Sequence, residues 1–281
     1  MDKFNILINL TRINKPIGIF LLLWPTLCGV FLASEGIPDI KILAIFILGT
    51  ILMRSAGCVA NDLVDRNLDS FVERTKDRPI TSGLVSIKYA TILLFILLFS
   101  AFALVLQLNH LTILISFLAL LFLLTYPFTK RFFSIPQLYL GVTFGFGILM
   151  AFSAIQNTIP IIAQILFISN IFWAFSYDSH YAISDMEDDK KLNIHSAPLT
   201  FNNKIILMVT LSYILMFLGL SIIGILKEFT ISFYILLGLA MIISMYGCFE
   251  SRHMEPNKNF KAFLRNNYVG LIIFTGFFFQ I

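Results

Sequence analysis

The sequence predicts an all-α, polytopic membrane protein. Of its 281 residues, 58% are hydrophobic and only 13% are charged, a balance far from that of soluble domains. The apolar residues gather in runs about 20 residues long, the length of a helix that crosses a bilayer. Runs such as ILLFILLFSAFALVL (92–106) are continuous, whereas the strands of a membrane barrel alternate between apolar and polar residues. The chain is therefore expected to be one transmembrane domain, 1–281.

Nine segments are long and apolar enough to span the membrane, and we expect them to surround a central cavity open to the cytoplasmic side. The third and fourth segments are separated at LNHL, residues 108–111. The candidate spans are 17–34, 40–60, 87–108, 111–128, 137–156, 159–182, 204–226, 229–249 and 265–280.

The distribution of basic residues predicts the orientation. Seventeen of the 20 Lys and Arg residues fall at the N-terminus or in loops on the same side, and only Lys41 and Lys227 fall in the opposite loops. The positive-inside rule then places the N-terminus in the cytoplasm and, with nine spans, the C-terminus outside. The two long loops, 62–86 and 183–203, lie on the cytoplasmic side, so we expect the active site there, in a cytoplasmic or inner membrane.

Acidic residues follow two of the apolar segments in the same pattern. Each pattern contains an Asp-x-x-x-Asp pair, whose members are neighbours on one face of a helix. Adjacent carboxylates repel unless a cation lies between them, and Mg²⁺ commonly bridges carboxylates to a substrate phosphate. Two facing pairs would therefore form a diphosphate site. At about 100° per residue, the first stripe comprises Arg54, Asn61, Asp65 and Asp69, within roughly 80°, and the second Asp178, Asp185 and Asp189, within roughly 40°.

Basic residues near these acids can complete the neutralisation of a diphosphate. Arg54 stands out because it lies about two turns inside an apolar segment, where an ionisable group is costly and faces a cavity or a partner. Tyr126 and Lys130 have an i, i+4 spacing at the end of another segment. A diphosphate held beside an apolar cavity points to an isoprenoid substrate. The loop residues available are Arg66, Arg74, Lys76, Arg78, Lys130 and Arg131.

The chain resembles the UbiA-type membrane prenyltransferases over nearly its whole length. The first signature of that family, N-D-x-x-D-x-x-x-D followed by R-T-x-x-R-P-[IL]-x-S-G, is present as NDLVDRNLDSFVERTKDRPITSG. The second, D-x-x-Y-A-x-x-D-x-x-D-D, is present as DSHYAISDMEDD. KPIGIFLLLWPTLCG (15–29), RSAGCVAND (54–62), YPFTKR (126–131) and NNYVG (266–270) are features of its 4-hydroxybenzoate branch.

This resemblance implies a Mg²⁺-dependent transfer of a polyprenyl group from polyprenyl diphosphate to the ring carbon next to the hydroxyl of 4-hydroxybenzoate, a step of ubiquinone biosynthesis. Asn61, Asp65, Asp69, Asp185 and Asp189 would hold the Mg²⁺ and the diphosphate, the four aspartates being the catalytic set. The resemblance also implies that Tyr126 and Lys130 contact the phosphates and that Arg54 and Arg131 serve the substrate anions. We expect Arg66, Arg74 and Arg78 to bind the diphosphate as well, because they lie near the acids, and we expect Arg54, Arg131 and Asp185 to bind the aromatic acid. The expected partners are these two substrates and the lipid bilayer, with no nucleic acid and no obligatory protein partner.

Two points stay open at this stage. After its second signature the family usually has Lys-Ser-Thr, whereas this chain has His195, Ser196 and Ala197, so the fixed cation of a lysine is replaced by an imidazole. The alternatives are a UbiA-type enzyme with another acceptor (protohaem, a naphthoate or a chlorin) and a secondary transporter that uses the acids as a route. A transporter would be expected to carry charges at both ends of that route, and here they gather at one.

Overall fold

The structure is a computed structural model that describes residues 3–71 and 75–280, and within these ranges it contains helices and no strand. The all-α prediction is confirmed. The helices are α1 (Lys3–Thr11), α2 (Ile17–Ser34), α3 (Ile40–Asp69), α4 (Ile87–Val105), α5 (His110–Thr129), α6 (Pro136–Gln156), α7 (Ile161–Lys191), α8 (Ala197–Phe201), a 3-10 turn (Asn202–Lys204), α9 (Ile205–Leu226), α10 (Ile231–Glu250) and α11 (Pro256–Phe278).

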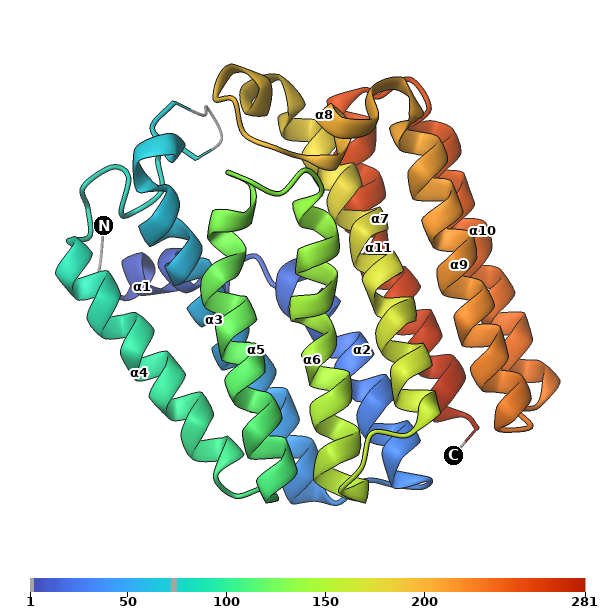
Figure 1. The fold of residues 1–281 in the computed structure, drawn as a ribbon. Coiled ribbons are helices and arrows are strands. Elements are labelled where there is room, and N and C mark those ends of the chain that lie inside the picture. The colour runs from blue at the N-terminus through green and yellow to red at the C-terminus, as the bar shows by residue number, and fades with distance from the viewer. Residues whose placement is uncertain (1–2, 72–74, 281) are drawn as a thin grey trace.

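The long helices run up and down through the molecule, side by side (Figure 1). Among the described residues, eight are long and apolar enough to cross a membrane. The ninth expected span, 265–280, covers the apolar second half of α11, which ends at Phe278. Lys258 and Lys261 precede this half and Arg265 begins it. The chain is therefore an integral membrane protein, and the count of nine spans stays a prediction.

Helices α3 and α7 are longer than the apolar segments that predicted them. We expected spans at 40–60 and 159–182 followed by loops 62–86 and 183–203, but the helices continue to Asp69 and Lys191. A helix of 31 residues is about 46 Å long, well beyond the hydrocarbon core of about 30 Å. Their polar last turns therefore extend past the apolar layer while keeping their backbone hydrogen bonds, and the acids lie on helices instead of loops.

Close helix packing fixes the positions of the central helices. Helix α6 packs along both α2 and α7, and α7 packs along α9 and α11. Gly141 of α6 lies so close to α7 that an added Cβ would approach the Cα of Ile171 to 2.8 Å. Small residues at such contacts let helix backbones approach within a membrane.

An ion pair joins two helix ends on the side opposite the acids. Glu35 at the end of α2 pairs with Lys227 at the end of α9. The hydrogen bond and the charge of Lys227 hold the pKa of the Glu35 carboxyl below its usual range.

A second, smaller core anchors the N-terminal helix. Leu10 of α1 packs with Val59 of α3 and with Ile80 and Val85 of the α3–α4 connection, all of them buried. This cluster holds α1 and the connection against the last turns of α3. It places the residues that follow α1 beside the first acidic stripe.

Candidate functional site

A cavity of about 1010 Å³ lies between the helices, and both acidic stripes line it. Helices α3 and α7 end on the same side of the molecule, the upper side in Figure 1. Their acids therefore lie at the same end of the cavity although they are more than 100 residues apart in the sequence. The polar end is lined by Asn61, Asp62, Asp65, Asp69, Asp178, Asp185 and Asp189. The remainder is largely apolar and includes Phe46, Phe99, Phe102, Phe117, Leu120 and Leu123.

Asp65 is the more buried carboxylate of the first Asp-x-x-x-Asp pair, Asp65 and Asp69. Its side chain is 1% exposed, and its Oδ2 accepts a hydrogen bond from the ammonium of Lys130, the residue that caps α5. Its other oxygen, Oδ1, is buried and has no hydrogen-bond partner. An unsatisfied carboxylate oxygen is costly inside a protein. This atom is therefore suited to a ligand that brings positive charge.

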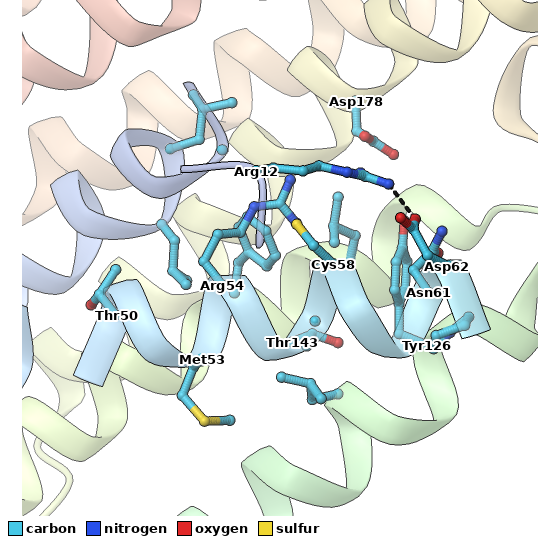
Figure 2. Close-up of a pocket in the computed structure, with 18 of the residues that line it drawn as sticks. Arg12, Thr50, Met53, Arg54, Cys58, Asn61, Asp62, Tyr126, Thr143 and Asp178 are labelled. Atoms are coloured by element: carbon cyan, nitrogen blue, oxygen red, sulfur yellow. Dashed lines mark hydrogen bonds and ion pairs between the residues drawn. The ribbon is translucent and has the colours of Figure 1, made fainter. Parts of the chain in front are cut away.

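Asp62 and Asp69 share the cation of Arg78. The Arg78 guanidinium lies 2.6 Å from Asp69 Oδ2 and 3.1 Å from Asp62 Oδ1. Asp62 also pairs with Arg12, which reaches it from the turn between α1 and α2 (Figure 2). Two arginines from distant parts of the chain are thus gathered at the polar end, beside a carboxylate whose side chain is 1% exposed.

Neighbouring carboxylates near the end of α7 face in different directions. Asp185 and Asp189 line the cavity, one turn apart on the helix. Asp188 is not among the lining residues and instead pairs with Lys191 at 3.2 Å on a largely exposed face. Of these three carboxylates, Asp185 and Asp189 therefore line the cavity shared with the acids of α3, and Asp188 does not.

The positions of the acidic side chains bear on the predicted Mg²⁺ site. Across residues 3–71 and 75–280, no three or more His, Cys, Asp and Glu side chains stand close enough together to hold a metal ion by themselves. The two stripes instead face a shared space. Such a site fits Mg²⁺, which binds through one or two carboxylates and keeps waters and substrate phosphates as its other ligands. The free Oδ1 of Asp65 is an oxygen of the required kind.

Arg54 lies deeper in the cavity than Asp65 and Asp69, which are about three and four turns further along α3. It projects from α3 toward the side on which Arg12 and Asp178 lie, whereas Met53 points away from that side (Figure 2). Its guanidinium stands 5.8 Å from the centre of the Phe144 ring, a favourable arrangement for a cation and an aromatic face. A charged group at this depth fits the expected binding of a substrate anion.

The structure separates the predicted basic residues into two groups. Tyr126, Lys130, Arg54 and Arg78 line the cavity, whereas Arg66 and Arg131 are not among its lining residues. Both of the latter are exposed and donate to backbone carbonyl oxygens, Arg66 to that of Leu63 at 2.6 Å and Arg131 to that of Val64 at 3.1 Å. Arg74 lies outside the described residues.

The segment that departs from the Lys-Ser-Thr pattern is held at the site through its backbone. The His195 N–H donates to the carbonyl oxygen of Lys130 at 2.7 Å, and the Ala197 N–H donates to Gln137 Oε1 at 3.0 Å. His195 and Ser196 both line the cavity. The segment therefore stays over the polar end with an imidazole in place of the usual ammonium.

Sequence reasoning missed Arg12 and Asp62 as site residues. Asp62 stands inside the first signature, yet the Asp-x-x-x-Asp spacing drew attention to its neighbours. Arg12 precedes the NKPIG stretch and was counted only as a basic residue of the inner side. The signal that was present is the short distance in sequence between Arg12 and the first apolar segment, which keeps it at the membrane boundary.

Comparison with known proteins shows the family. The sequence model of the UbiA prenyltransferase family matches residues 22–270. The chain belongs to the UbiA family. Among UbiA relatives, a 4-hydroxybenzoate octaprenyltransferase of Nitrosomonas eutropha is 47% identical over 277 residues, which are 98% of this chain and 96% of that protein. One of Methylobacillus flagellatus is 47% identical over 275 residues, 98% of this chain and 93% of that protein.

Solved structures show the same UbiA fold. A UbiA homologue from Aeropyrum pernix K1 in its apo form matches with a TM-score of 0.79 at 22% identity, covering 93% of this chain and 97% of that one. A UbiA homologue from Archaeoglobus fulgidus bound to GPP and Mg²⁺ matches with a TM-score of 0.74 at 17% identity, covering 98% and 99%.

Proposed function

We propose that this protein transfers a polyprenyl group from polyprenyl diphosphate to 4-hydroxybenzoate in ubiquinone biosynthesis. The observation that carries the proposal is the cavity, in which two acidic helix ends share a polar end that continues into an apolar space. The proposal is supported by relatives named 4-hydroxybenzoate octaprenyltransferase that are 44–47% identical over nearly the whole chain. The transferred group and the acceptor are taken from those names.

The polar end is assigned to the diphosphate. Asn61, Asp65 and Asp69 on α3 and Asp185 and Asp189 on α7 would hold Mg²⁺, which supplies positive charge to the leaving diphosphate when bound. The cations Lys130, Arg78 and Arg12 complete this neutralisation, and the Tyr126 hydroxyl adds a hydrogen-bond donor. Because these groups are in place before the reaction, they stabilise the charge that develops on the departing oxygen.

The apolar part of the cavity is assigned to the polyprenyl chain. Its side chains, such as Phe99, Phe102 and Phe117 from α4 and α5, offer the chain a surface as apolar as itself. They also exclude water from the allylic carbon that loses the diphosphate. Exclusion of water matters because water would otherwise compete with the aromatic ring for that carbon.

The aromatic acid is assigned to the space between these regions. Arg54 and Asp65 are eleven residues apart on α3, a separation of about 16 Å along the helix axis. That length accommodates a benzoate whose carboxylate pairs with Arg54 and whose reacting ring carbon faces the first carbon of the prenyl diphosphate. We assign Asp185 to the acceptor hydroxyl as well as to the cation. The ring proton then passes to the released diphosphate or to an acid of the site.

The basic residues give the proposed orientation. The polar end of the cavity lies on the side that carries most of the Lys and Arg residues, which the positive-inside rule assigns to the cytoplasm. We therefore propose an inner-membrane location with the active site open to the cytoplasm.

The test uses the purified protein in detergent with Mg²⁺, 4-hydroxybenzoate and prenyl diphosphates of graded length, followed by mass analysis. The proposal predicts a 3-polyprenyl-4-hydroxybenzoate and released diphosphate. Absence of this product, together with transfer to a naphthoate, a chlorin or protohaem in parallel reactions, would replace the acceptor. Absence of product with every acceptor would overturn the enzymatic assignment.

A further inference from the structure

Gly18, the second residue of α2, lies against the end of the Arg54 side chain. It is buried and lines the cavity. A Cβ added at Gly18 would lie 2.3 Å from Arg54 Nε, 2.4 Å from Nη2 and 2.7 Å from Cζ. Any side chain at this position would therefore occupy the place of the guanidinium.

The backbone gives no separate reason for a glycine here. Of the glycines in the described part of the chain, only Gly83 has a positive φ, +75°. Gly18 has ordinary helical geometry, and alanine is a better helix former than glycine at such a position. The close approach of Arg54 is thus the feature that requires the missing side chain.

The Arg54 guanidinium, which occupies the space beside Gly18, forms no ion pair within the described residues. Arg12, Arg78 and Lys130 each pair with an aspartate at the polar end. For Arg54 the structure gives the contact with the Phe144 ring and, without an ion pair, the attraction of the Asp178 carboxylate, which lines the same cavity. A cation inside a membrane segment is retained where it meets an anion or a water-filled cavity, so this group is placed to receive an anionic ligand.

We propose that Gly18 is a positioning residue for the aromatic acid: by lacking a side chain it fixes the Arg54 guanidinium at the depth where the carboxylate of the acceptor binds. This inference rests on the proposed function. It assigns selectivity for the acid group of the acceptor to the first turn of α2, through the contact of Gly18 with Arg54.

Gly18→Ala is expected to fold normally and to move Arg54. The atoms that clash are the far end of a flexible side chain, with no backbone atom among them. To reach an ordinary contact of at least 3.4 Å from 2.3 Å, Nε must shift by about 1 Å. A charged hydrogen bond depends steeply on such a shift, and its loss corresponds to about a tenfold to a hundredfold weaker binding.

The experiment measures KM for each substrate separately in detergent-purified wild type, Gly18→Ala and Gly238→Ala. Gly238 on α10 is the matched control, because an added Cβ there meets no atom within 4 Å. We expect Gly18→Ala to raise KM for 4-hydroxybenzoate at least about tenfold, to leave KM for the prenyl diphosphate within about twofold, and the control to match wild type. With the neutral acceptor 4-hydroxybenzamide, Gly18→Ala and wild type should differ by less than about twofold.

A double-mutant cycle with Arg54→Ala separates the positioning role from a general packing role. In the Arg54→Ala background the Gly18 substitution should change KM for 4-hydroxybenzoate by less than about twofold. The inference is overturned if Gly18→Ala behaves like the control, if it raises KM for both substrates equally, or if its effect persists without Arg54. Absence of product with wild-type protein would instead overturn the proposed function, so the two failures are distinguishable.

Discussion

The neighbouring carboxylates Asp188 and Asp189 provide a sharp test of the site, because they belong to one motif and differ only in the direction they face. Asp189 lines the cavity, and Asp188 pairs with Lys191 on an exposed face. Each is changed to Asn, which preserves the shape of the side chain and removes its charge. The site assignment predicts very different results for the two variants.

The expected magnitudes follow from the two environments. Asp189→Asn removes a carboxylate from the group that would hold Mg²⁺ and the diphosphate, and loss of one such transition-state contact costs about 2.7–4 kcal/mol, or about 10²–10³ in kcat/KM. The Asp188 pair has side chains 29% and 72% exposed, and exposed i, i+3 pairs contribute about 0.3–0.5 kcal/mol. Asp188→Asn should therefore keep its activity within about twofold.

The assay follows transfer of a labelled prenyl group to 4-hydroxybenzoate at saturating Mg²⁺, with both variants brought to equal amounts of folded protein by size-exclusion chromatography in detergent. Equal losses in the two variants, or a larger loss in Asp188→Asn, would refute the direction assigned to these side chains.

Two further predictions concern the basic residues. Asp62→Asn leaves Arg12 and Arg78 without their shared carboxylate. Since both arginines are partly exposed, we expect a loss of about 1–3 kcal/mol in unfolding free energy, measured as a lower thermal midpoint in detergent. An unchanged midpoint would contradict the ion-pair account. Arg131→Ala, outside the cavity lining, should raise KM for 4-hydroxybenzoate far less than Arg54→Ala, and the reverse order would return the acceptor carboxylate to Arg131.

The acidic stripes could be placed from the sequence because they follow local periodicity. Helices α3 and α7 keep the same 100° advance beyond their apolar parts, so the phase of Asp65 relative to Asn61 holds to the end of the helix. The sequence also predicted that the two helix ends lie on one side of the membrane, because the order of the spans and the distribution of basic residues place both there. Helix lengths were underestimated because hydropathy marks where the bilayer ends, which is not where the backbone stops being helical.

The remaining errors involve contacts that no local pattern encodes. Arg12 meets Asp62 across fifty residues of sequence, and this pairing depends on how α1 packs against α3. Lys130 and Arg131 are adjacent and chemically alike, yet α5 ends at Thr129 and only the first of them turns toward the cavity. The direction of a side chain after a helix end depends on tertiary packing, which periodicity does not describe.

Binding of a prenyl thiolodiphosphate, an analogue that reacts very slowly, tests most directly whether the two acidic helix ends act together on one cation and one diphosphate. Its Kd is measured for wild type, Asp65→Asn and Asp189→Asn, with Mg²⁺ and with EDTA. The account predicts tight binding only for wild type with Mg²⁺, and weakening of at least about tenfold by EDTA or by either substitution. Binding that is indifferent to Mg²⁺, or that is weakened by a change on one helix and unaffected by a change on the other, would contradict it.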